Sequence, residues 1–229
     1  MMTNYLFIAA VILFAALIIR GYRKGFLRIV VYFIGMIFII VSVKKISPTV
    51  SQYLMDNTSA YTDIKGKISD TLKEKNEIFD NTVEENQKLT IESYDMPQLL
   101  KTNLLINNTA EMYKTLLVSM FEDYVSSYLA KTAVNALSFI GLFVILWIAF
   151  RVVLSLCNLI SKIPIIKGIN KMAGALLGLV EALFVSWIFF FIVIVFMGNE
   201  VGNKMMIMVN QSQFLQTLFN SNILFSIVS

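Results

Sequence analysis

The stretch SKIPIIKGINKMAGALLGLVEAL, residues 161–183, decides how this chain folds. It begins with basic and interfacial residues and then enters an apolar run that continues to Met197. Small residues recur inside the run at every fourth position, and one acid, Glu181, interrupts it. This pattern predicts a membrane helix with a cytoplasmic basic end and a face of small residues for helix packing. The predicted packing residues are Gly174, Gly178, Ala182 and Ser186.

The composition of the whole chain is that of a membrane protein with a polar insert. Charged residues make up 15% of the 229 residues and apolar residues 57%, whereas soluble domains have about 25% charged residues. Thirteen of the fifteen acids lie between Asp56 and Asp123. The net charge is −5 for residues 46–131 and +9 for the remainder, which gives the formal +4 of the chain. Because the basic residues flank apolar runs, they indicate membrane topology, and we expect no nucleic-acid partner.

Side chains that carry chemistry are scarce. The chain has one cysteine, Cys157, and no histidine, so we expect no internal disulfide and no metal site of the Cys/His type. It contains no phosphate-binding loop and no GxSxG, HExxH or CxxC motif, and the acids are spaced as on a solvated surface. We therefore predict no catalytic residues, no cofactor and no metal, in a protein that is not an enzyme.

Residues 1–45 predict two transmembrane helices joined by a basic cytoplasmic connector. The first run without a charged residue covers residues 1–19. A helix of this length, at ~1.5 Å per residue, crosses a ~30 Å hydrocarbon core. Positive charge follows the run, which favours a retained helix over a cleaved signal peptide. The second run, residues 29–43, is short, so a full span and a tilted or re-entrant half-span both stay open. Pro48 and Ser51 predict a break after it.

Residues 46–131 predict an acidic, helical, extracytoplasmic insert. Apolar residues at a step of four predict a helix within residues 59–78. Residues 81–95 are the least apolar part and predict a loop. Asp95 is expected to cap a short amphipathic helix over residues 96–106.

Residues 132–198 predict the third and fourth transmembrane helices, joined by a second basic cytoplasmic connector. A helical pattern from Thr109 is expected to continue without a break into the third helix. Pro164 predicts the end of that helix, and Asn170 is a candidate cap for the fourth, whose apolar run covers residues 172–197.

Residues 199–229 predict an amphipathic tail that lies on the outer surface of the membrane. The connectors around residues 20–28 and 151–171 are basic and contain no acid, which places both in the cytoplasm. With four spans, the N-terminus, the insert and the C-terminus then lie outside. The apolar face of the tail is formed by Phe214, Leu215, Leu218, Phe219, Leu224 and Phe225.

Three features leave alternatives open. Glu181 lies near the middle of the bilayer, where a charge costs ~3 kcal/mol on insertion scales, and no direct partner is evident in the sequence. It marks an ion or proton path, or it is a protonated acid bonded to a neighbouring hydroxyl or carbonyl. The small-residue face packs within the bundle or between subunits. The connector at residues 20–28 is a hairpin turn with a topology signal, or it contacts lipid head groups or a partner.

Two motifs lie on either side of the insert. R-G-x-x-x-G separates the first two apolar runs, and the second motif is a proline, then Ile-Asn, then two glycines four residues apart. These motifs resemble the colicin V production (CvpA) family of bacterial membrane proteins over residues 1–45 and about 130–200. The insert is longer than the connector usual in that family. The motif residues are Arg20, Gly21, Gly25, Pro164, Ile169, Asn170, Gly174 and Gly178.

The resemblance implies a multi-pass protein of the bacterial cytoplasmic (inner) membrane, with a role in peptide-toxin production or export, or more broadly in envelope homeostasis. It implies no catalytic residues. We predict an all-α integral membrane bundle of four transmembrane helices that acts in the lipid bilayer by assembling with itself or with other envelope proteins. The alternative is a channel or transporter-like unit with Glu181 in an ion or proton path. A third hypothesis is a scaffold whose acidic insert binds another envelope protein.

Overall fold

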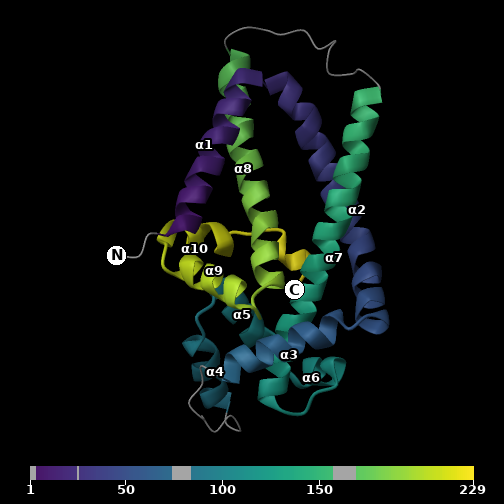
Figure 1. The fold of residues 1–229 in the computed structure, drawn as a ribbon, viewed down its shortest axis with the longest axis vertical. Coiled ribbons are helices and arrows are strands. Elements are labelled where there is room, and N and C mark those ends of the chain that lie inside the picture. The colour runs from purple at the N-terminus through teal and green to yellow at the C-terminus, as the bar shows by residue number, and fades with distance from the viewer. Residues whose placement is uncertain (1–3, 25, 74–83, 157–168) are drawn as a thin grey trace.

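The computed structural model of the protein describes residues 4–24, 26–73, 84–156 and 169–229. Every regular element in these ranges is a helix, and four helices are long and apolar enough to cross a membrane (Figure 1). The prediction of an all-α bundle with four transmembrane helices is confirmed. These helices are α1 (Tyr5–Lys24), α2 (Phe26–Asn57), α7 (Phe121–Leu156) and α8 (Ile169–Val195).

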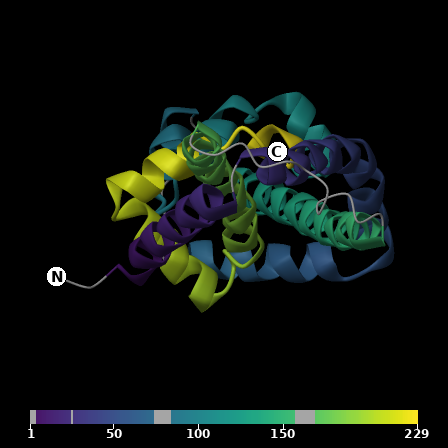
Figure 2. The same ribbon diagram turned by 90° about the horizontal axis from the view of Figure 1, so that it is seen from above.

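Helix α8 lies at the centre of the bundle. It packs along α1 on one side and against α2 and α7 on the other, and α2 also packs along α7 (Figures 1 and 2). Phe139 of α7 meets Phe191 of α8 edge to face, with ring centroids 5.1 Å apart. From this contact α7 and α8 diverge toward the end of the bundle where α8 begins. Helix α1 therefore depends mainly on α8 for its packing.

Helix α2 runs through Pro48 without ending there, so the predicted break is wrong. A proline inside a helix costs about 3 kcal/mol, because it lacks the N–H and its ring crowds the preceding turn. Here the helix continues because its far half packs on α7. Ser47 and Ser51 are buried, and the Ser51 hydroxyl donates to Oδ1 of Asn135 on α7. The resulting helix is long enough for a full span.

The described part of the insert contains four short helices, which gather at the end of the bundle opposite the C-terminal end of α1 (Figure 1). The helix predicted within residues 59–78 is present as α3. The loop predicted for residues 81–95 is wrong over most of its length, because a helix forms there and buries Ile91 completely. The predicted cap Asp95 is also wrong, since Pro97 occupies the N-cap of the next helix. The helices are α3 (Ala60–Lys73), α4 (Glu84–Ser93), α5 (Gln98–Ile106) and α6 (Ala110–Leu116).

The helix expected to run unbroken from Thr109 is interrupted before the third span. Leu117 closes α6 in the left-handed conformation, with φ of 55°, and α7 begins at Phe121. A left-handed non-glycine residue costs about 1–2 kcal/mol. The break lets α6 fold back on α7, where Tyr113 stacks on Tyr124 with ring centroids 4.9 Å apart. This aromatic contact offsets the conformational cost.

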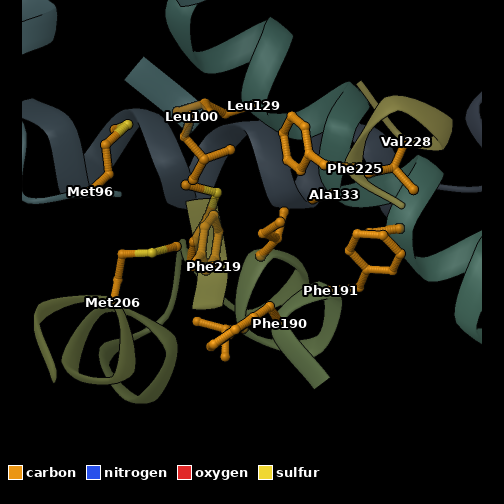
Figure 3. Close-up of a cluster of buried hydrophobic side chains, with 14 of the residues drawn as sticks. Met96, Leu100, Leu129, Ala133, Phe190, Phe191, Met206, Phe219, Phe225 and Val228 are labelled. Carbon is orange, nitrogen blue, oxygen red and sulfur yellow. The ribbon is translucent and has the colours of Figure 1, made fainter. Parts of the chain in front are cut away.

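The tail forms α9 (Glu200–Asn210), α10 (Gln213–Asn220) and a 3₁₀ turn, η1 (Phe225–Ile227). The apolar face predicted for the tail packs onto the bundle and the insert, whereas the position of the tail on the outer membrane surface stays a prediction. Phe219 of α10 and Phe190 of α8 lie side by side, and Leu100 and Leu129 enter the same core from α5 and α7 (Figure 3). Polar contacts add to the packing: the Trp187 indole N–H donates to the carbonyl of Leu218 at 3.0 Å.

Candidate functional site

The small-residue face of α8 meets α1 inside the same chain. A Cβ atom added to Gly178 would overlap the backbone carbonyl of Leu17, and one added to Gly21 would overlap the backbone carbonyl of Gly174. Because the obstructing atoms belong to the backbone, a larger side chain at either glycine would require the two helices to move apart. Such close approach maximises van der Waals contact, which is the main attraction between helices in lipid. The other two residues of the small-residue face, Ala182 and Ser186, are buried.

The antiparallel register of α1 and α8 sets the depth of Glu181. Gly178 lies opposite Leu17, and four residues away Gly174 lies opposite Gly21. The same register, extended by three residues, places Glu181 level with Phe14. Phe14 is in the middle of the 20-residue helix α1, so Glu181 lies near the middle of the span.

Glu181 is paired with Arg20 of α1. The guanidinium Nη2 donates to the carboxylate Oε1 at 2.5 Å. Cα–Cβ bonds in a helix point toward its N-terminus, so the Arg20 side chain extends along α1 from the basic end toward the depth of Glu181. The Glu181 side chain is only 13% exposed. A charge-assisted bond of this kind neutralises the acid within the apolar bundle and ties α1 to α8.

The described part of the chain leaves two atoms of this pair without a partner. Arg20 Nε and Glu181 Oε2 are buried, and neither has a hydrogen bond to any described residue. Glu181 also lines a cavity of about 10 Å³ together with Tyr32, Phe33 and Trp147. A single water needs ~10–15 Å³ of such space. The cavity therefore has room for about one water and is too small for a hydrated ion.

Cationic side chains lie over aromatic rings at the basic end of the bundle. The Arg151 guanidinium is 5.3 Å from the ring centroid of Tyr32, and the Lys24 ammonium is 6.0 Å from the same centroid. Lys171, in the first turn of α8, lies 5.6 Å from the centroid of Tyr22. Contacts of this type contribute about 0.5–2 kcal/mol each. They fix positive charge at the helix ends that the charge pattern assigns to the cytoplasm.

Arg20 is the site residue that sequence reasoning did not connect to Glu181. The sequence offered no evident partner for Glu181, and the structure corrects that interpretation, whereas the topology signal predicted for Arg20 stays a prediction. The two residues are 161 positions apart. The available signal was a single acid in one apolar run and an arginine at the edge of another, but joining them required knowing that α1 packs on α8.

The remaining motif residues are only partly described. Gly25, Pro164 and Cys157 lie outside the described residues, as do Lys162 and Lys167 of the second connector. The first connector is formed largely by two helix ends, since α1 continues to Lys24 and α2 begins one residue after Gly25. Asn170 does not cap α8, because the helix begins at Ile169 and Asn170 lies buried in its first turn. No cluster of three or more His, Cys, Asp or Glu residues suited to a metal occurs in the described ranges.

Comparison with known proteins identifies one family. The family model described as colicin V production protein matches residues 109–222, about half of the chain. A protein of Bacillus subtilis strain 168, described as uncharacterized transmembrane protein YshB, is 38% identical over 58 residues. That segment is 25% of this chain and 33% of the relative, so the match spans a third of the relative's length. No solved structure matches the chain.

The match agrees with the helices and with the second motif. It contains the central helix α8 with Asn170, Gly174 and Gly178, together with the described part of α7 and most of the tail. It does not reach residues 1–45, so the resemblance of the first motif stays a prediction. The chain is a multi-pass membrane protein that belongs to the colicin V production protein family.

Proposed function

We propose that this protein supports the production or export of a colicin V-type peptide toxin, or envelope homeostasis, as a non-enzymatic structural component of a bacterial cytoplasmic membrane. The link to toxin production comes from the family to which the chain belongs. The proposed mode of action is a helical platform in the membrane that assembles with itself or with other envelope proteins.

The observation that carries this proposal is the closed ion pair between Arg20 and Glu181. An acid in the middle of a membrane span is a candidate for proton or ion transport. Here its Oε1 is bonded to an arginine of the same bundle, and the adjoining cavity has space for about one water. The ion pair therefore holds α1 against α8, and this supports a structural role for Glu181.

The arrangement of the helices supports the proposed orientation. The insert helices, α9 and α10 gather at one end of the bundle, and Lys24 and Lys171 lie at the other (Figure 1). The positive-inside rule assigns the basic end to the cytoplasm. The insert, which carries a net charge of −5 over residues 46–131, then faces the outside, where it offers an acidic surface to other envelope proteins.

Permeation is the second candidate, and one observation favours it. Glu181 lines the small cavity next to Trp147, and its Oε2 has no partner among the described residues. A water in that cavity would give the free oxygen a route for proton exchange. In this reading Glu181 lies in an ion or proton path.

Exchanging the two charges tests the structural role. Arg20→Gln leaves the largely buried Glu181 charge unpaired, and we expect it to lower the free energy of unfolding by about 3 kcal/mol. Glu181→Gln leaves Arg20 unpaired, and because 39% of the Arg20 side chain is exposed, we expect a smaller loss. The double exchange, Arg20→Glu with Glu181→Arg, should recover most of that loss. The measurements are the unfolding of the purified protein in mixed micelles and the amount of toxin secreted by a host that lacks its own family member. Dye entry into the same cells reports on the envelope role.

The exposed ion pair of α9 provides the matched control. Lys204 pairs with Glu200 at 2.6 Å on the surface, so Glu200→Gln should leave the free energy of unfolding nearly unchanged. If Glu181→Gln leaves unfolding and assembly unchanged but stops proton flux in proteoliposomes, the structural role is wrong and the protein is a permeation unit. If the charge exchange restores stability while secretion and envelope integrity stay lost, the pair is not the basis of function.

A further inference from the structure

An apolar pocket of about 100 Å³ lies between α1, α8 and α10, along the half of α1 that precedes Phe14. This is far more space than the ~10–15 Å³ needed by one water. Its wall is almost entirely hydrocarbon. The lining includes Ala9, Ala10 and Leu13 of α1, Ser186 and Phe190 of α8, and Leu215 of α10.

The register of the two helices explains the pocket. Where Gly178 lies opposite Leu17, the backbones touch. Eight residues further along α8, Ser186 is level with Ala9, so small side chains face each other on both helices. Because α10 closes the far side with Leu215, the helices are kept apart there and the space between the small side chains stays unfilled. The small-residue face thus makes a contact at one end and a pocket at the other.

Ser186 lines this pocket, and its hydroxyl has no partner among the described residues. Ser186 is 4% exposed, and its Oγ makes no hydrogen bond to any described residue. Ser42 and Ser138, which are also in membrane helices, donate to the carbonyl four residues earlier. A buried hydroxyl without a hydrogen bond costs about 1–3 kcal/mol in proteins. An occupant with a hydrogen-bond acceptor would remove that cost.

The depth of the pocket indicates what fills it. Ala9 is the fifth residue of α1, about 6 Å from the start of a helix that spans the membrane. The hydrocarbon core is ~30 Å thick, so the pocket lies within one leaflet, and Ala9 is about 6 Å below the level where acyl chains join their ester groups. Only 6% of the α1 span is buried within the protein, so the medium beside this pocket is lipid.

We propose that the pocket binds one acyl chain of a phospholipid, whose ester carbonyl accepts a hydrogen bond from the Ser186 hydroxyl. The chain fills the apolar space between α1 and α8 beneath α10. The ester group supplies the acceptor that Ser186 lacks. The binding is independent of the toxin or envelope role.

Photolabelling of the full-length protein tests this proposal. The protein is reconstituted in nanodiscs of phosphatidylglycerol and phosphatidylethanolamine that contain a trace of phospholipid with a diazirine near the carboxyl end of one chain. After irradiation, mass spectrometry compares labelling of the peptides that carry Ala10 and Phe190 with labelling of the lipid-facing peptide around Ile145. We expect the pocket peptides to carry several times more label. Equal labelling of all three peptides would overturn the proposal.

Two variants separate the pocket from general lipid contact. Ala10→Phe fills the space and should reduce pocket labelling to the level of the Ile145 peptide, whereas Ala15→Phe, at an exposed position of the same helix, should leave labelling unchanged. Ser186→Ala removes one hydrogen bond and should lower pocket labelling about fivefold. The matched change Ser42→Ala should have no effect.

The serine variants keep the proposal testable if Ala10→Phe does not fold. Unchanged labelling in Ser186→Ala would remove the hydrogen bond from the proposal.

Discussion

The contact between α1 and α8 and the core around α10 lie in one bundle but are built differently. The first has glycines, backbone contact and the Arg20–Glu181 pair. The second has large apolar side chains from the insert, the spans and the tail, with Phe219 fully buried among them (Figure 3).

The surroundings explain this difference. Lipid tails are as apolar as leucine, so apolar side chains gain little by leaving lipid for a helix interface. Close backbone contact and a shielded ion pair hold helices together there. At the end of the bundle that carries the insert, apolar side chains leave water when they pack, at roughly 25 cal/mol per Å² of buried area. The same chain therefore uses small residues in one region and large ones in the other.

The largest expected effect comes from emptying the water-side core. Phe219→Ala removes a fully buried ring, and we expect the free energy of unfolding to fall by about 4 kcal/mol. The matched change Phe196→Ala removes a ring that is 48% exposed and should cost much less. Denaturant titration followed by circular dichroism measures both. Equal losses in the two variants would show that burial from water does not distinguish this region.

A smaller but still large effect is expected at the backbone contact. Gly178→Leu forces α1 and α8 apart, and we expect a loss of about 3 kcal/mol. Gly141 lies in α7 with nothing within 4 Å of an added Cβ, so Gly141→Leu should be neutral or slightly stabilising. Unfolding in mixed micelles compares the two variants. If Gly178→Leu is as stable as Gly141→Leu, close backbone contact is not what joins α1 to α8.

The smallest effect tests whether polar contacts matter in the core. Trp187→Phe removes the hydrogen bond to the Leu218 carbonyl and should cost about 1 kcal/mol. Trp147→Phe is the control, because the Trp147 indole N–H has no hydrogen bond to any described residue, although its ring lies 5.9 Å from Arg151. Thermal unfolding of the reconstituted protein measures the difference. A greater loss in Trp147→Phe would assign more weight to the cation–π contact than to the bond between α8 and α10.

The sequence predicted the spans well but failed where neighbours decide the local structure. Residues 81–95 look like a loop by polarity, yet α4 forms there because Ile91 enters the core. Pro48 looks like a helix end, yet α2 continues because Ser51 is bonded to Asn135. Both errors have one cause: packing against distant segments outweighed the local preference of the chain.

The sequence alone determined the class of the protein, its four spans, the basic end of the bundle and the motif that indicates its family. These properties follow from local hydropathy, charge and spacing, which the thickness of a bilayer converts directly into helices. Only the tertiary structure decided that Arg20 reaches Glu181, that the tail packs on the bundle, and that the small-residue face of α8 ends in a pocket at Ser186. These depend on which helices are neighbours and in what register, and contacts across 161 residues leave no local trace in the sequence.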